Sequence, residues 1–282
     1  LEVPENASEI AVSFGDARFT VPVRSNRCAD FAGTRTIFTV NKNNDLGWIR
    51  EWASWHAHHH GADAAVLTDN GSTAYMPEEI AETLASVPGM KQVSVESWPV
   101  KFGPIDPAVF NNPYWSRFFQ ISSMSMTLRR YGMLADGLLN CDVDELAVTQ
   151  SGRSMFDVAR ESPGGLVVFR GLWVEALVEP DAPPRPPHRA YRQVLADPKA
   201  ALSPQRKWAL DPSRPWVERL SVHPYWHWIE GRDRRAKSMP EDASYRHFRG
   251  INTNWKTARS TPPTDAVRRD PILDRAFGEL ER

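Results

Sequence analysis

Short apolar segments alternate with segments of helical periodicity over the first half of the chain, and this order restricts the fold more than any other feature. Four runs rich in β-branched or aliphatic residues are predicted strands: 36–40, 64–68, 92–95 and 137–141. Three segments between them are predicted helices: 46–60, which Gly61 is placed to end, 78–85 and 112–131. Strands joined through helices favour right-handed crossovers. We therefore predict an α/β fold with helices flanking a mostly parallel sheet.

The two ends of the chain follow a looser pattern. Residues 10–23 alternate around Gly15-Asp16 and predict an N-terminal hairpin. The second half predicts three further strands and a closing helix: 206–210, 219–222, 245–248 and 268–281. Segment 179–187 is rich in proline, which excludes a helix or a central strand. We expect that segment to form a long surface loop.

Composition excludes several classes of protein. The 34 basic and 35 acidic residues nearly cancel, so we expect no nucleic-acid partner. Cys28 and Cys141 are too few for a disulfide framework or a zinc site, and Cys141 is expected to be a small buried thiol. No apolar run is long enough to cross a bilayer. We expect a cytoplasmic protein.

The segment Asn140-Cys141-Asp142-Val143-Asp144-Glu145 carries the strongest chemical signal. Its carboxylates follow a predicted strand, and at that edge of a parallel sheet ligands bind. Crowded carboxylates repel one another unless a cation is present, and Mg²⁺ or Mn²⁺ takes one or two of them together with substrate phosphates. If the strand continues, Asp142 and Asp144 point to one side and share the metal, while Glu145 points away and pairs with a basic neighbour. The competing interpretation is a solvated acidic turn.

Several motifs around this segment together resemble a known family. The blocks are 41–52 with His56, Gly61-Ala62-Asp63, 68–72, Arg129–Tyr131, 140–146, Lys207, 221–223 and 245–248. Their order and spacing resemble bacterial family-2-like and family-92-like glycosyltransferases, with a GT-A-type, Rossmann-like fold, over residues 36–256. Lys42 stands where that family has a glutamate, and Phe248 where it has a tyrosine.

The resemblance implies a metal-dependent enzyme that moves a sugar from a nucleoside diphosphate sugar to a polysaccharide, glycan or lipid-linked acceptor. It implies Asn41, Lys42 and Asp69 at the nucleotide. Asp142 and Asp144 would hold Mn²⁺ or Mg²⁺, with Asp142 also near the ribose and His247 as a third ligand. Lys207, Arg246 and Lys256 would add positive charge at the leaving diphosphate. Glu175 is the candidate base, with Asp233 as an alternative.

The resemblance also divides the chain into parts. We expect a hairpin extension over 1–35, a nucleotide-sugar-binding half over 36–150, and an acceptor-binding half with a closing helix over 151–282, in one compact domain. A carbohydrate or glycolipid acceptor allows peripheral association with the inner face of a membrane. The aromatic residues around Trp226 are candidates for stacking on the acceptor.

Other interpretations remain open. The tryptophans suit a carbohydrate-binding module, and the carboxylates suit a metal-dependent nucleotidyltransferase. A catalytically silent relative of the glycosyltransferases is a further alternative. The histidines at 56 and 58–60 suggest a second metal site, but no acidic third ligand accompanies them, so a polar helix end is the better interpretation.

Overall fold

The central feature of the computed structural model is an eight-stranded sheet of order β5-β4-β3-β6-β10-β8-β13-β7. The structure describes residues 6–103, 118–178, 182–218, 224–225, 228–229, 241–253 and 263–280. The strands of this sheet are β3 (Arg35–Asn41), β4 (Ala64–Asp69), β5 (Gln92–Ser97), β6 (Gly137–Asn140), β7 (Glu145–Thr149), β8 (Leu166–Val174), β10 (Leu202–Leu210) and β13 (Ala243–Phe248). Strands from the two halves of the chain therefore share one sheet.

Parallel pairing brings the early strands into register at their carboxyl ends. β5, β4, β3 and β6 are mutually parallel, with Asn41 opposite Asp69 and Phe38 opposite Asn140. β8 and β13 are also parallel, whereas β10 runs antiparallel to both β6 and β8, and β7 runs antiparallel to β13. The loops after β4, β3 and β6 consequently leave the sheet side by side. The predicted α/β fold with a mostly parallel sheet is confirmed.

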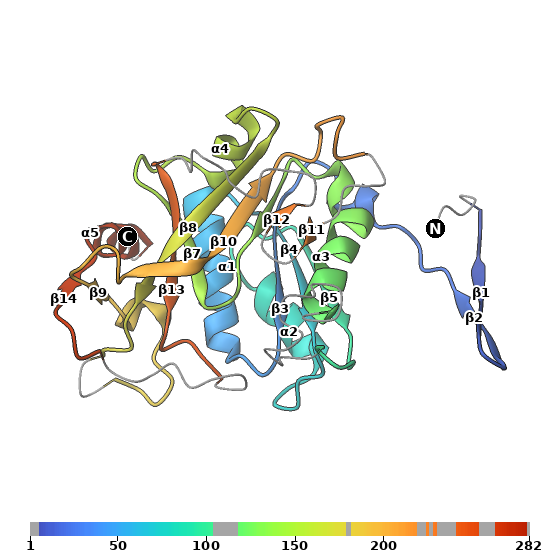
Figure 1. Ribbon diagram of the computed structural model, residues 1–282, viewed down its shortest axis with the longest axis horizontal. Coiled ribbons are helices and arrows are strands. Elements are labelled where there is room, and N and C mark those ends of the chain that lie inside the picture. The colour runs from blue at the N-terminus through green and yellow to red at the C-terminus, as the bar shows by residue number, and fades with distance from the viewer. Residues whose placement is uncertain are drawn as a thin grey trace.

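Helices cover both faces of the sheet (Figure 1). They are α1 (Leu46–His60), α2 (Pro77–Ala85), α3 (Phe118–Arg130), α4 (Met155–Glu161) and α5 (Pro271–Leu280), with short 3-10 turns η1 (Cys28–Phe31), η3 (Gly132–Leu134) and η4 (His188–Ala190). Ile37 and Phe38 are successive in β3 and point to opposite faces. Ile37 joins the core under α1, α2, α4 and α5, and Phe38 joins the core under α3.

Local signals in the sequence set the ends of α1. The Asp45 carboxylate accepts the amide hydrogen of Gly47 at 2.8 Å and caps the start of the helix. Gly61 ends it in the left-handed conformation with φ 67°, which a residue without a Cβ adopts at little cost. None of the described helices is long and apolar enough to span a membrane.

The remaining strands among the described residues form three small two-stranded sheets. These pair β1 (Glu9–Phe14) with β2 (Ala17–Pro22), β11 (Pro224–Tyr225) with β12 (Trp228–Ile229), and β9 (Gln193–Leu195) with β14 (Val267–Arg269). The predicted N-terminal hairpin is confirmed, and it stands apart from the body (Figure 1). The predicted strand at 219–222 lies outside the described residues. The predicted closing helix is shorter than expected, because residues 267–269 form a strand.

Candidate functional site

The acidic segment forms a turn after β6. The strand ends at Asn140, and the chain reverses before β7 begins at Glu145. The Glu145 amide donates to the Asp142 carbonyl at 2.9 Å, and the Asp142 amide donates to the Glu145 carboxylate at 2.8 Å. The expectation that a continuing strand carries Asp142 and Asp144 on one side is therefore wrong, because these two hydrogen bonds close a turn instead. We call residues 141–145 the acidic turn.

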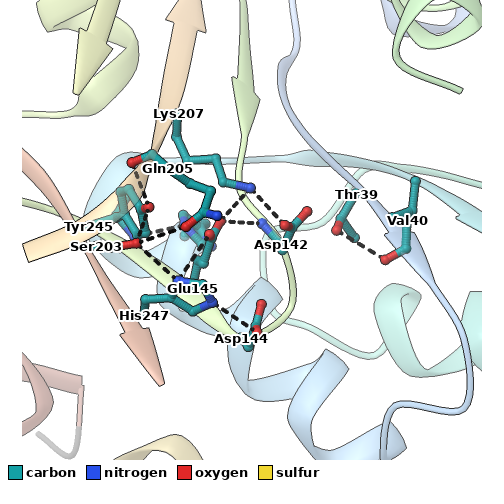
Figure 2. Close-up of polar contacts among 12 residues, drawn as sticks. Thr39, Val40, Asp142, Asp144, Glu145, Ser203, Gln205, Lys207, Tyr245 and His247 are labelled. Carbon is teal, nitrogen blue, oxygen red and sulfur yellow. Dashed lines mark hydrogen bonds and ion pairs between the residues drawn. The ribbon is translucent and has the colours of Figure 1, made fainter. Parts of the chain in front are cut away.

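Lys207 joins two of the carboxylates. Its ammonium lies 2.7 Å from Asp142 Oδ2 and 2.8 Å from Glu145 Oε2, and its side chain is fully buried (Figure 2). Burial disfavours the charged ammonium, but Asp142 and Glu145 outweigh it and raise the pKa of Lys207. The expectation that Glu145 pairs with a basic neighbour is confirmed. β10 supplies that neighbour because it pairs with β6 beside the acidic turn.

Asp144, Glu145 and His247 form a group that could hold a metal ion. One ligand atom from each lies within 4.8 Å of the others. His247 Nε2 is 3.1 Å from Asp144 Oδ2, and His247 Nδ1 is 3.8 Å from Glu145 Oε1 (Figure 2). Antiparallel pairing of β13 with β7 places His247 directly opposite Glu145. Sequence reasoning missed Glu145 as a member, because the strand pattern assigned its side chain to the other side.

The chemistry of this group fits a small divalent cation. Carboxylate oxygens suit Mg²⁺ or Mn²⁺, and the imidazole favours Mn²⁺. The buried Oδ1 of Asp142 has no hydrogen-bond partner among the described residues, so this oxygen is free to accept a contact from a bound cation or its water shell. Burial raises the pKa of Glu145, the charge of Lys207 lowers it, and the neighbouring Asp142 raises it again. A divalent cation would offset this crowding of negative charge.

The His247 ring is held on several sides. Ser203 Oγ lies 3.3 Å from Nδ1 and 2.9 Å from the Tyr245 hydroxyl. Trp173 stacks on the imidazole, with ring centroids 3.9 Å apart and an interplanar angle of 21°. The guanidinium carbon of Arg249 lies 4.2 Å from the centroid of the Trp173 ring. No sequence motif indicated these contacts, because they arise where β8, β10 and β13 lie side by side.

The loops after β3 and β4 are bound to one another. Asn41 Nδ2 donates to Asp69 Oδ1 at 2.7 Å, and both side chains are buried. The Asp69 carboxylate also accepts from the amide and hydroxyl of Ser72, at 2.8 and 2.5 Å. Lys42 donates to the Asn70 carbonyl at 3.0 Å. Asn41 and Asp69 thus shape these loops, and the nucleotide-binding roles of Asn41, Lys42 and Asp69 stay predictions.

The remaining candidates lie in different places. Arg246 points away from His247 and forms a buried ion pair with Asp270 at the start of α5, so the structure does not place it at the acidic turn. Glu175 is buried directly after β8 and lies 3.2 Å from Arg249, and its role as a base stays a prediction. Lys256, Asp233 and Trp226 lie outside the described residues.

Two histidines of α1, His56 and His60, are hydrogen-bonded to the backbone. His56 and His60 are fully buried or nearly so, and their Nε2 atoms lie 3.2 Å from the amide and 2.9 Å from the carbonyl of Ala147. Within the parts of the chain that the structure describes, the group that could hold a metal is the one at the acidic turn. The buried thiol expected at Cys141 is also present, and burial raises its pKa well above the usual value.

No protein-family profile matches the sequence, and no curated protein is similar to it. Among solved structures, the crystal structure of an active-site mutant of LgtC aligns with 87% of this chain and 95% of its own, at 12% identity and a TM-score of 0.34. Similarity at this level indicates nothing about activity. What the site can do chemically has to be inferred from its own residues.

Proposed function

We propose that this chain is a metal-dependent glycosyltransferase, which transfers a sugar from a nucleoside diphosphate sugar to a carbohydrate or lipid-linked acceptor. The observation that carries this proposal is the group formed by Asp144, Glu145 and His247, whose ligand atoms lie within 4.8 Å of one another. Asp144 and Glu145 of this group follow β6, which is parallel to the neighbouring β3, and β3 is in turn parallel to β4. Ligands of α/β sheets bind at the carboxyl ends of such strands. The motif resemblance to bacterial glycosyltransferases supports the same assignment.

In the proposed reaction, the bond between the anomeric carbon and the diphosphate oxygen breaks, and the acceptor hydroxyl oxygen bonds to that carbon. The hydroxyl proton passes to a base, for which Glu175 is the candidate, and the nucleoside diphosphate leaves with the electron pair. A bound Mn²⁺ or Mg²⁺ would stabilise the negative charge of the leaving diphosphate. Asp144, Glu145 and His247 would hold the cation, with Asp142 Oδ1 beside them. Lys207 keeps Asp142 and Glu145 in place through its two ion pairs.

The same assignment gives the two sides of the site different tasks. The loops after β3 and β4, with Asn41 and Asp69, would bind the nucleotide. The second half of the chain would bind the acceptor. Trp173 belongs to that half and stacks on His247. The α/β architecture is unlike the all-β architecture typical of a carbohydrate-binding module. A nucleotidyltransferase would share the metal group, so its nucleotide-transfer products need to be measured alongside free sugar.

The first prediction tests whether the group formed by Asp144, Glu145 and His247 binds a metal ion. Calorimetry with UDP and GDP is expected to show binding that depends on Mn²⁺ and is lost in EDTA. Asp144→Asn is expected to weaken the Mn²⁺-dependent binding at least about tenfold, because it removes a charged oxygen ligand from the cation. Incubation with UDP-, GDP- and CMP-sugars, with and without Mn²⁺, then identifies the donor by release of free sugar or its transfer to an added acceptor.

Asp157→Asn is the matched control. Asp157 lies in α4, outside the acidic turn, and pairs with Arg35 at 2.7 Å with a partly exposed side chain. That variant is expected to bind nucleotide as the wild type does. Nucleotide binding that is the same with Mn²⁺ and with EDTA, or an Asp144→Asn variant that binds like the wild type, would falsify the proposal.

A further inference from the structure

We infer that Glu51 and His188 are positioning residues for the acidic turn: they hold its backbone so that Asp142, Asp144 and Glu145 converge. His188 Nε2 lies 2.8 Å from the carbonyl oxygen of Val143, between the two aspartates of the turn. Glu51, in α1, holds the opposite side of the His188 ring. The metal-binding consequence of this inference rests on the proposed function, whereas the backbone contact does not.

The Glu51 carboxylate contacts both backbone and side-chain groups of η4. It accepts the backbone amide of His188 at 2.6 Å, faces His188 Nδ1 at 3.1 Å, and accepts Arg189 Nε at 2.9 Å. Burial raises the pKa of Glu51, but its contacts with His188 and Arg189 outweigh burial, so the pKa lies below its usual value. Glu51 therefore remains a carboxylate in the folded protein at neutral pH.

Both ring nitrogens of His188 face an acceptor. A hydrogen on Nε2 donates to the Val143 carbonyl, and the other side of the ring is fixed by the Glu51 carboxylate, which contacts Nδ1 and the backbone amide of His188. Both side chains are buried, with 0% of His188 and 5% of Glu51 exposed, so water does not replace these contacts. The pair links α1 to the acidic turn across a sequence separation of 45 residues from His188 to Val143.

The Val143 carbonyl is a backbone group of the acidic turn whose hydrogen-bond partner is a side chain from another segment. The Asp142 carbonyl accepts from the Glu145 amide, and the Asp144 carbonyl accepts from the Phe248 amide at 2.8 Å. Val143 is buried. Losing the donor from His188 would leave a buried carbonyl unpaired, at a cost comparable to a lost hydrogen bond. The turn would then shift, and its carboxylates with it.

The segment that carries His188 is itself attached to α1. Trp48 Nε1 donates to the Pro186 carbonyl at 2.9 Å, and Arg185 lies 3.2 Å from Asp45. The described part of the proline-rich segment, 182–187, is thus held against the first turns of α1. We predicted a surface loop there. Its contacts with α1 also fix the position of His188, which follows directly and reaches the acidic turn.

Two substitutions of His188 distinguish its hydrogen bond to the Val143 carbonyl from its contact with Glu51. Glutamine places an amide nitrogen near the position of Nε2 and keeps a donor for Val143, whereas asparagine reaches only the position of Nδ1. We expect His188→Asn to speed hydrogen exchange of residues 141–147 at least fivefold, and His188→Gln to stay within twofold of the wild type. With Mn²⁺ alone as the probe, His188→Asn is expected to weaken binding about tenfold, with His188→Gln again close to the wild type.

The control is a variant that is destabilised elsewhere. Leu84 lies in the fully buried face of α2, so Leu84→Ala should lower the melting temperature. The ratio of the hydrogen-exchange rate in residues 141–147 to that in residues 64–69 should stay as in the wild type. Equal exchange in His188→Asn and the wild type, or equal loss in the asparagine and glutamine variants, overturns the inference. If the wild type binds no Mn²⁺, the proposed function fails, and hydrogen exchange still decides whether His188 positions the turn.

Discussion

At the scale of single residues, Lys207 is the side chain that pairs two carboxylates of the acidic turn. It is fully buried and ion-paired with both Asp142 and Glu145. A buried charge is costly unless it is paired, and removing one partner leaves the others unpaired in a medium that solvates them poorly. Lys207 therefore supplies a fixed positive charge in the protein, and the metal that we propose would add to it.

We predict that Lys207→Met lowers the free energy of unfolding by about 3–5 kcal/mol, the range for breaking a buried ion pair. Added Mn²⁺ is expected to recover part of this loss, because a divalent cation replaces the missing positive charge. Urea denaturation at pH 7.5, with and without Mn²⁺, measures both effects.

Lys91→Met is the matched control for this measurement. Lys91 pairs with Asp63 at 2.8 Å, but its side chain is 71% exposed, so its removal should change stability far less. If the two methionine variants lost the same stability, burial of the Lys207 pair would not be the cause.

At the scale of elements, α1 covers an edge of the central sheet. β7 is the last strand, and its outer edge needs partners for its backbone groups. Ala147 obtains them from three side chains of α1: its amide from His56, and its carbonyl from His60 and from Trp55 Nε1 at 2.8 Å. His56 and His60 thus act in place of a neighbouring strand. Their positions four residues apart suit this role, because they lie on one face of the helix.

This arrangement predicts acid sensitivity. Burial lowers the pKa of His60 from 6.5 to about 4 and that of His56 well below 6.5. Between those pH values the unfolded chain binds protons that the folded chain does not, so the free energy of unfolding falls as pH falls from about 6.5 to about 4. One such histidine contributes up to about 1.4 kcal/mol per pH unit. Denaturation curves at pH 6.5, 5.5 and 4.5 for the wild type and for His60→Gln are expected to show a shallower dependence in the variant.

The exposed His58 of the same helix is the control. His58→Gln is expected to follow the pH dependence of the wild type, because that side chain is exposed and replaces no buried contact of β7. A His60→Gln variant with the wild-type pH dependence would mean that other groups cause the acid sensitivity.

At the scale of the whole molecule, the N-terminal hairpin forms a sheet of its own, apart from the central sheet. One face of the hairpin is apolar, because cross-strand partners such as Val12 and Phe19 point to the same side. That face is open: 83% of Phe14 and 53% of Phe19 are exposed. Each hairpin strand pairs with the other in a sheet of its own. A two-stranded hairpin of this kind is marginally stable and adds little to the body.

We therefore predict that deleting residues 1–22 changes the free energy of unfolding of the body by less than about 1 kcal/mol, or about 2 °C in melting temperature. Mn²⁺ affinity should also be unchanged, since the acidic turn lies in the central sheet. Differential scanning calorimetry and Mn²⁺ titration of the shortened chain test this. A drop of 10 °C or more would show that the hairpin packs on the body in solution.

The sequence by itself determined the local elements of this protein. The strand 36–40, the helix from Leu46 to its stop at Gly61 and the strand 64–68 lie where periodicity and turn residues predicted them. The acidic segment was also found at a strand end, because an apolar run followed by clustered carboxylates is a contiguous pattern. Such features depend on neighbours within a few residues, so they can be read along the chain.

The tertiary structure alone decided which side chains meet at the acidic turn. Lys207 is 65 residues from Asp142, and His247 is 103 residues from Asp144. They meet because β10 pairs with β6 and β13 pairs with β7, an order that no local periodicity specifies. The direction of the Glu145 side chain could not be predicted from the sequence either. The Glu145 amide donates to the Asp142 carbonyl and the Asp142 amide donates to the Glu145 carboxylate, so a turn forms where a strand was expected. Strand order and turn closure are decided by packing of the whole sheet, and the candidate site forms only where that packing brings the strands together.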